Sequence, residues 1–212
     1  MFDLDGTIVD TETPEFESIR AVWSDHGADY TVADFEHCIG TAVGIEAWLE
    51  DLVALVGYDI DRAAADERRR GVHRELIAAL QPREGVVALL DEAATLGVSM
   101  AVASNSPEWW VRARLEALGL DHHFAALMTI DRSSHPKPHP APFVEACAAI
   151  GSDPARSVAF EDSSTGVASA RAAGLFTIAC PGPLTANHDL SAAHRVIASH
   201  AEIRLAELTL VH

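Results

Sequence analysis

The pattern of apolar residues changes near residue 82, and this change limits what the chain can fold into. Beyond it, short apolar strands alternate with helices that stop at glycines. The strands are expected at 98–103, 125–130, 157–160 and 175–179, and the helices at 84–96, 107–118, 141–150 and 165–173. This alternation predicts an α/β fold, a doubly wound parallel sheet with helices on both faces. We expect a short edge strand at 194–198 and a helical turn or two at 202–208.

The segment before this change is helical in character. Phe16, Ile19 and Trp23 recur at helical spacing, and residues 13–81 contain no strand-like run. We therefore expect an all-α insertion of residues 13–81 into an α/β core of residues 1–12 and 82–212. The first strand of that core, which ends in Asp3, should be central in the sheet.

Size and charge narrow the class of protein. The 212 residues suit one domain with a modest insertion, and no apolar run approaches the roughly 20 residues of a membrane span. The net charge of −17 should repel nucleic acid and anionic membranes, so we expect neither as a partner. Cys38, Cys147 and Cys180 are few and far apart, which favours reduced thiols in a cytoplasmic protein. We expect a monomer.

The segment Asp3-Leu4-Asp5-Gly6 carries the strongest chemical signal. Residues two apart on a strand point to the same side, so Asp3 and Asp5 should converge where the strand ends. Two convergent carboxylates can hold a divalent cation, and one can attack while the other moves a proton. Only two residues precede Asp3, so we expect either that the natural chain starts upstream or that this strand is unusually short and the stability low.

Further polar clusters follow the other predicted strands. In a doubly wound sheet, ligands bind outside the carboxyl ends of the strands. Ser104-Asn105-Ser106, Lys137 and Glu161-Asp162-Ser163 all stand at such ends, together with Asp3 and Asp5. Each cluster alone has a simpler interpretation, as a solvated turn, a helix cap or a surface lysine. Their convergence on one edge of one sheet favours a single site.

A phosphoryl-transfer mechanism can be assembled from these residues. Asp3 would attack a phosphate monoester, and Asp5 would protonate the leaving oxygen and then deprotonate water. Mg²⁺ would be held by Asp3 and Asp5 together with Asp162 and Glu161. Ser104 and nearby backbone N–H groups would bind phosphoryl oxygens, and Lys137 would stabilise the charged transition state. By contrast, Trp109-Trp110 is interpreted as helix packing, and Arg68 to Arg70 as a solvated helix face.

Four motifs resemble those of the haloacid dehalogenase-like superfamily over essentially the whole chain. They are Asp3-Leu4-Asp5-Gly6-Thr7, Val102-Ala103-Ser104-Asn105, Lys137-Pro138-His139-Pro140 and Phe160-Glu161-Asp162-Ser163. The resemblance implies a Rossmann-like core with a helical cap, nucleophile Asp3, acid/base Asp5, and Thr7, Ser104, Asn105 and Lys137 on the phosphate. The insertion after the first motif is similar to that of the helical-cap subclass, which holds β-phosphoglucomutase-like proteins and phosphatases.

The resemblance leaves several functions open. A dehalogenase is disfavoured, because the dehalogenases of the family lack the second aspartate and Asp5 is present. A β-phosphoglucomutase-like phosphomutase is the nearest alternative, but this chain has Thr7 and Glu15 at positions where such mutases carry other residues. A non-catalytic phosphometabolite-binding protein is an alternative of another class. We expect a phosphoric monoester hydrolase, a Mg²⁺-dependent phosphatase acting on a small phosphorylated metabolite such as a sugar phosphate or nucleotide. Its substrate should contact the loop at 39–44 and the helix near Glu12 and Glu15.

Overall fold

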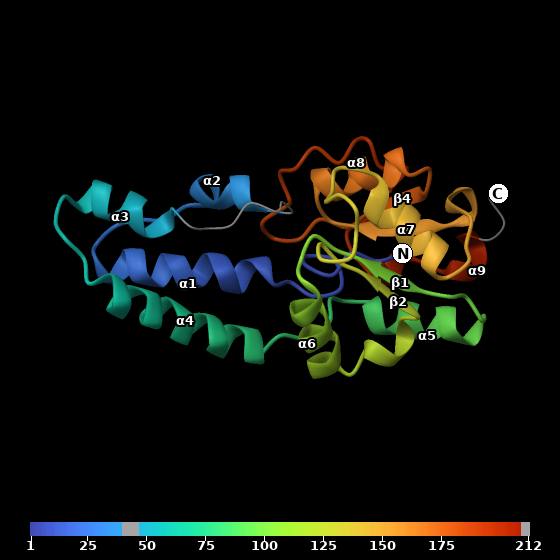
Figure 1. Ribbon diagram of the computed structural model, residues 1–212, viewed down its shortest axis with the longest axis horizontal. Coiled ribbons are helices and arrows are strands. Elements are labelled where there is room, and N and C mark those ends of the chain that lie inside the picture. The colour runs from blue at the N-terminus through green and yellow to red at the C-terminus, as the bar shows by residue number, and fades with distance from the viewer. Residues whose placement is uncertain (40–46, 209–212) are drawn as a thin grey trace.

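The computed structural model describes residues 1–39 and 47–208 of the chain (Figure 1). The helices and strands follow the expected order. The first part holds α1 (Glu12–Asp25), α2 (Val32–Phe35), α3 (Trp48–Val56) and α4 (Arg62–Ala78). The second part holds α5 (Val86–Thr95), β1 (Ala101–Ala103), α6 (Glu108–Leu118), β2 (Ala126–Met128), α7 (Ala141–Ala149), β3 (Val158–Glu161), α8 (Ser164–Ala172), β4 (Phe176–Ala179), β5 (Arg195–Val196) and α9 (Leu205–Leu208).

The sheet is parallel, as predicted. β1 pairs with β2, and β4 lies between β3 and β5. The first residues of the chain join these two groups, because Phe2 forms parallel bridges to Val102 on one side and to Phe160 on the other. The Phe2 N–H donates to Ala101 at 2.9 Å, and the Asp3 N–H donates to Phe160 at 3.0 Å. The N-terminal segment therefore takes the central position in the sheet. Phe2 is its bridged residue on both sides.

Alternate residues of β1 and β3 pack against helices on opposite faces of the sheet. Val102 and Phe160 belong to a buried apolar cluster with α5 and α6. Ala101, Ala103 and Ala159 belong to another cluster with α7 and α8. Figure 1 shows these two pairs of helices on either side of β1 and β2. This two-sided burial explains why the strands read as continuous apolar runs rather than alternating ones.

Helices α1 to α4 form a separate group, which we call the helical lobe (Figure 1). The lobe has its own apolar cluster, built around Phe16, Ile19, Trp23 and Leu52. The described residues between 13 and 81 contain no strand, in line with the expectation. The chain leaves and re-enters the core at neighbouring points, because Val9 and Pro82 form an antiparallel bridge. The domain boundaries at 13 and 81 stay a prediction.

The structure also bears on the expectations about membrane spans and cysteines. Among the described residues, no helix combines the length and apolar character needed to cross a membrane. Cys147 and Cys180 are buried free thiols, in keeping with the interpretation of the cysteines, while the side chain of Cys38 lies outside the described part. The short helix α2 was not expected, because a single turn leaves too little periodicity to recognise in sequence.

Candidate active site

The carboxyl ends of the strands bring the polar clusters together around one cavity. Its volume is about 160 Å³. The core contributes Asp3, Asp5, Ser104, Asn105, Ser106, Trp110, Lys137 and Ser163 to the lining, and the lobe side contributes Thr11, Glu12 and Glu15. Residues from five separate stretches of the chain thus meet at one sheet edge, where an open α/β sheet binds its ligands.

One part of this site is a buried group of charges, which we call the ion cluster: Asp3, Lys137, Glu161 and Asp162. The Lys137 ammonium donates to Asp3 Oδ1 at 2.6 Å and also to Glu161 Oε1. All four residues are buried, and Glu161 is fully so. Burial alone would lower the pKa of Lys137, but the carboxylates of Asp3 and Glu161 raise it instead. Lys137 is therefore a permanent cation between these two acids.

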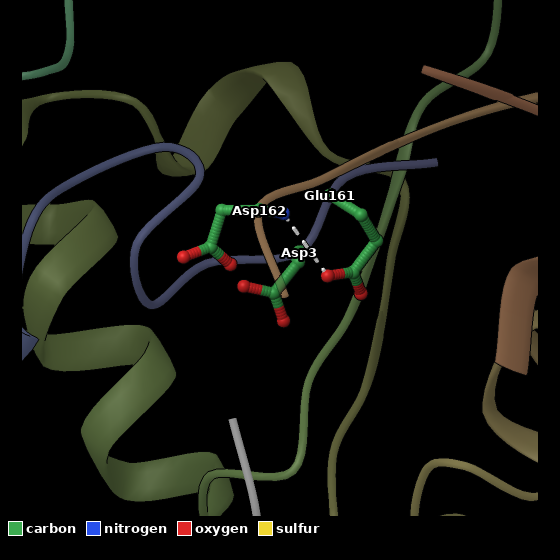
Figure 2. Close-up of side chains that lie close together, drawn as sticks. All are labelled: Asp3, Glu161 and Asp162. Carbon is green, nitrogen blue, oxygen red and sulfur yellow. Dashed lines mark hydrogen bonds between the residues drawn. The ribbon is translucent and has the colours of Figure 1, made fainter. Parts of the chain in front are cut away.

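The three carboxylates of the ion cluster form a candidate divalent-cation site. Oxygens of Asp3, Glu161 and Asp162 lie within 4.8 Å of one another, and Figure 2 shows Asp3 between the other two. Burial raises the pKa of Asp3 and of Asp162, and mutual repulsion adds to this. Three acids face a single ammonium group, so a hard cation bound by oxygen would offset the remaining negative charge. The donor set fits Mg²⁺.

Asp5 does not join this group, which departs from the predicted set of four metal-binding carboxylates. The acidic group found among the described residues contains Asp3, Glu161 and Asp162. Both oxygens of Asp5 instead accept hydrogen bonds from neutral donors. Asp3 and Asp5 are two residues apart, yet Asp3 accepts from the Lys137 ammonium and Asp5 accepts from hydroxyls and an indole.

The surroundings of Asp5 form a second part of the site, the Asp5 cradle: Asp5, Thr11, Ser104, Ser106 and Trp110. Asp5 Oδ1 accepts from Thr11 Oγ1 at 2.6 Å and from Trp110 Nε1 at 2.8 Å. Asp5 Oδ2 accepts from Ser106 Oγ at 2.6 Å and from Ser104 Oγ at 3.4 Å. These donors come from the start of α1, the segment after β1, and α6. The Asp5 carboxylate is thereby held by neutral donors from three segments of the chain.

Two glycines give the acids of the ion cluster their room. Gly6 has φ +84°, and a Cβ there would lie 2.1 Å from Asp162 Oδ2. Gly166, in the first turn of α8, faces Glu161 so closely that a Cβ would lie 2.0 Å from its carboxyl carbon. A side chain at either position would push a carboxylate out of place.

Three of the predicted phosphate-binding residues, Ser104, Asn105 and Thr7, have different surroundings in the structure. Ser104 lines the cavity, and its hydroxyl accepts from the Ser106 N–H at 2.9 Å. Helix α6 has no side-chain cap at its start, so the helix-cap interpretation is wrong, and phosphate binding by Ser104 stays a prediction. Asn105 uses its amide to exchange hydrogen bonds with the Lys137 backbone, at 2.8 and 3.2 Å. Thr7 is fully buried outside the cavity lining, with its hydroxyl 3.5 Å from Asp162 Oδ1. Asn105 therefore anchors the lysine loop, and Thr7 supports Asp162.

The helical lobe closes one side of the cavity. Glu15 lines it and is itself paired with Arg69 at 2.6 Å, and His73 Nε2 lies 3.1 Å from the same carboxylate. Arg69 departs from the interpretation as a solvated face, whereas its neighbours Arg68 and Arg70 do pair with acids at the surface. Beyond Ile39, the predicted substrate loop at 39–44 lies outside the described residues.

Sequence reasoning missed several residues of the site. Trp110 was expected to pack a helix, yet its N–H reaches Asp5. Arg83 binds three backbone carbonyls, those of Gly6, Cys180 and Pro181. Thr185 donates to Asp162 at 3.2 Å. The position of Ser106 beside Ser104 was a usable signal, but nothing in the local sequence connects Trp110, Arg83 or Thr185 to the aspartates.

The chain and its fold match a known family. The chain belongs to the haloacid dehalogenase-like hydrolases, whose family model matches residues 1–180. It is therefore a hydrolase of that family, and the resemblance seen in the four motifs is confirmed.

Individual relatives agree with this assignment. YhcW of Bacillus subtilis is 32% identical over 98% of this chain and 94% of its own length. The fructose-1-phosphate phosphatase YqaB of Escherichia coli is 32% identical, covering 82% of this chain and 92% of its own. A crystal structure of a family hydrolase from Deinococcus radiodurans with bound phosphate and sodium superimposes with a TM-score of 0.78 at 25% identity, covering 97% and 93% of the two chains.

Proposed function

We propose that this protein is a Mg²⁺-dependent phosphatase that hydrolyses a small phosphate monoester through an aspartyl-phosphate intermediate. The observation that carries this proposal is the division of one cavity between two parts. On one side Asp3 stands beside a buried ammonium group and two further acids, and on the other Asp5 is held by neutral donors. This is the pairing of nucleophile and acid/base that phosphoryl transfer to a carboxylate requires.

The candidate cation site supports the magnesium requirement. Asp3, Glu161 and Asp162 would hold the ion. Bound Mg²⁺ would withdraw charge from the phosphoryl oxygens and reduce the repulsion between Asp3 and an anionic substrate. Lys137 contributes a second, fixed positive charge next to Asp3 Oδ1. It stabilises the charge that builds up as the phosphoryl group moves.

The first half of the reaction transfers the phosphoryl group to the protein. A carboxylate oxygen of Asp3 attacks phosphorus, and the bond between phosphorus and the ester oxygen breaks. The electron pair of that bond stays on the ester oxygen, which takes a proton from Asp5 and leaves as a neutral alcohol. At the end of this step Asp3 carries the phosphoryl group and Asp5 is a carboxylate.

The second half releases inorganic phosphate. Asp5 takes a proton from a water molecule as the water oxygen attacks phosphorus. The bond between phosphorus and the Asp3 oxygen breaks, and its electron pair restores the Asp3 carboxylate. Asp5 is protonated again and ready for the next substrate. The net change is the hydrolysis of one phosphate ester by one water molecule.

The substrate class follows from the size of the cavity and the character of its walls. A cavity of about 160 Å³ beneath the helical lobe suits a phosphoryl group and part of a small leaving group. Sugar phosphates and nucleotides fit this description. We propose that the lobe acts as a cap that excludes water during transfer. With the buried free thiols, these points support a cytoplasmic metabolite phosphatase.

The proposal is tested by phosphate release from purified protein over a panel of sugar phosphates and nucleotides, with and without Mg²⁺. We expect turnover that disappears with a chelator and returns with added Mg²⁺. Trapping of ³²P on the wild-type chain but not on Asp3→Asn would locate the intermediate. Binding of the phosphorylated compounds without turnover would support the non-catalytic alternative instead.

Product identity separates the phosphatase from the phosphomutase alternative. A phosphatase releases inorganic phosphate in equal amount to the alcohol. An isomerised sugar phosphate without free phosphate would establish the mutase. Thr7 and Glu15 favour the phosphatase, because β-phosphoglucomutase-like mutases carry other residues at these positions. In the structure Glu15 is engaged with Arg69 and His73.

A further inference from the structure

Trp110 is a member of the Asp5 cradle that, like Thr11 and Ser106, lies outside the four family motifs. It lies in the first turn of α6, and its indole Nε1–H donates to Asp5 Oδ1 at 2.8 Å. Its neighbour Trp109 is 69% exposed, whereas the Trp110 ring is partly buried against the core. Two adjacent tryptophans on one helix thus have different surroundings, and only Trp110 reaches the site.

We propose that Trp110 is a positioning residue that decides which oxygen of Asp5 carries the proton during catalysis. This inference rests on the proposed function, in which Asp5 is the acid and base. It depends on the chemistry of the donor. An indole N–H can donate a hydrogen bond but cannot accept one. Asp5 Oδ1, which receives this N–H, therefore has to remain an acceptor.

The other neighbours of Asp5 carry no such restriction. The hydroxyls of Thr11, Ser104 and Ser106 can each rotate to donate or to accept. Ser106 Oγ lies 2.6 Å from Asp5 Oδ2, and Ser104 Oγ lies 3.4 Å from it. A proton on Oδ2 can be donated to a serine hydroxyl and leaves Oδ1 as a carbonyl oxygen for the indole N–H. A proton on Oδ1 could be donated to Thr11 Oγ1, 2.6 Å away, but it would leave the indole N–H with a hydroxyl oxygen, the weaker acceptor. Trp110 thereby directs the transferable proton to Oδ2, the oxygen that faces the two serines of the phosphate-binding segment.

The packing around the ring keeps this donor in place. The Trp110 ring stacks against His73 of α4, with centroids 6.1 Å apart and planes inclined by 22°. The Arg114 guanidinium lies 4.8 Å from the ring centroid. The indole is thus packed both by its own helix and by a helix of the lobe. A ring fixed from two elements offers a preorganised donor, which is what a positioning role requires.

A leaving-group experiment separates positioning from a merely structural role. Protonation by Asp5 matters for an alkyl phosphate, whose alkoxide leaves poorly, and matters little for p-nitrophenyl phosphate. We would measure the single-turnover release of the alcohol or of nitrophenolate, which reports the first step alone. For Trp110→Phe we expect a loss of about tenfold or more with the alkyl phosphate and less than about threefold with p-nitrophenyl phosphate. Trp109→Phe is the matched control and should change neither rate.

A second variant guards against loss of folding. Benzothienylalanine, incorporated at position 110 alone, keeps the shape of the ring and replaces the N–H with sulfur. It should reproduce the selective loss of Trp110→Phe while the melting temperature stays at the wild-type value. Equal losses with the two substrates, or no loss with either, would overturn the proposal. Wild-type protein that shows no Mg²⁺-dependent phosphate release would overturn the proposed function, and this inference with it.

A spectroscopic readout tests the contact without relying on activity. The chain has four tryptophans, so its indole N–H groups give four signals in a ¹⁵N–¹H spectrum. Trp110→Phe identifies one of them. In Asp5→Ala that same signal should move upfield, because a hydrogen bond to a carboxylate is lost, while the other three stay in place. An unmoved Trp110 signal would show that the N–H does not hold Asp5.

Discussion

The ion cluster and the Asp5 cradle occupy the same cavity but are built in opposite ways. In the ion cluster, buried acids surround a buried ammonium group, and burial raises the pKa of Asp3 and Asp162. In the cradle, the carboxylate of Asp5 is surrounded by hydroxyls and an indole, with no cation among them. Identical side chains two residues apart thus have neighbours of opposite character, which suits them to distinct chemical roles. A charge-rich setting suits a nucleophile and a metal ion, and a setting of neutral donors suits proton exchange.

The largest expected effect is on turnover and separates the two aspartates. Asp3→Asn should reduce hydrolysis by about a thousandfold or more with every substrate, because the nucleophile is gone. Asp5→Asn should reduce alkyl phosphate cleavage by about a hundredfold or more and affect the first step of p-nitrophenyl phosphate cleavage far less. Single-turnover measurements with both substrates check this. If the two variants were equally sensitive to the leaving group, Asp3 and Asp5 would not have separate roles.

Gly6 follows Asp5 in the chain and lies against Asp162 of the ion cluster. Gly6→Ala should destabilise the fold by about 3 kcal/mol and weaken Mg²⁺ binding, because its Cβ would collide with Asp162 Oδ2. Gly57→Ala is the control: its φ of +75° is similar, but nothing lies within 4 Å of the added Cβ. The control should cost about 1 kcal/mol from backbone strain alone.

Urea unfolding of both glycine variants, with and without Mg²⁺, measures the difference. If Gly6→Ala and Gly57→Ala cost the same, the close approach of Gly6 to Asp162 has no energetic weight. Calorimetry should show that Gly57→Ala retains the Mg²⁺ affinity of the wild-type protein. A Gly6→Ala protein with unchanged affinity would contradict the prediction.

His200 is a buried titratable group that, unlike Asp3 and Asp5, has no hydrogen bond to its side chain from the part of the chain that the structure describes. Its ring nitrogens have no hydrogen-bond partner among the described residues, and burial, aided by Arg83, lowers the pKa of His200 to about 4. The unfolded chain takes up this proton near its ordinary pKa of about 6.5, whereas the folded protein does so only near pH 4. The stability contributed by the neutral ring is therefore present above about pH 6.5 and is lost as the pH falls toward 4. The loss amounts to about 3 kcal/mol.

The measurement is urea unfolding of wild type and His200→Phe between pH 4 and pH 8. The difference in unfolding free energy between the two proteins should change in favour of the variant as the pH falls. Outside this window the difference should be constant. Parallel curves across the whole range would show that the buried ring does not resist protonation.

The smallest expected effect lies within the Asp5 cradle. Ser106→Ala removes one neutral donor from Asp5 Oδ2, while Thr11 and Trp110 remain on Oδ1. We expect about a fivefold decrease in the single-turnover rate with an alkyl phosphate, corresponding to about 1 kcal/mol. Ser133→Ala, at a serine whose hydroxyl binds the His135 carbonyl, should leave the rate unchanged. A decrease as large as that of Asp5→Asn would mean that Ser106 itself takes part in proton transfer.

The fold was largely predictable because its signals are local. Strands β1, β2 and β4 lie within the apolar runs expected for them, β3 ends one residue later than expected, and the intervening helices end within about three residues of their predicted limits. The expected strand at 98–103 is shorter in the structure, beginning at Ala101, and Val98 is 43% exposed. Strand limits depend on where a neighbour is available to pair, which the local sequence does not record.

The site was predictable only in part, for a related reason. The rule that ligands lie at the carboxyl ends of strands brings Asp3, Ser104, Lys137 and Asp162 together without knowledge of any contact. The partner of Trp110 is 105 positions away in the chain, and a tryptophan on a helix ordinarily packs. Likewise, Asn105 lines the cavity, where phosphate binding stays a prediction, and its anchoring of the Lys137 backbone was not foreseen. Residues that act on another residue leave a weaker trace in sequence than residues that act on the ligand.

The bridge between Val9 and Pro82 has a consequence for how such a molecule can be rebuilt. A segment whose two ends already lie side by side can be cut out and replaced through a single splice. A tight two-residue turn joining residues 9 and 82 would span the gap. The bare sheet would keep Asp3, Lys137, Glu161 and Asp162, and it would lose the wall formed by Glu12 and Glu15. It would also lose Thr11, which donates to Asp5. The helical lobe is thus a segment that can be exchanged through one splice, provided that the replacement restores the hydrogen bond from Thr11 to Asp5.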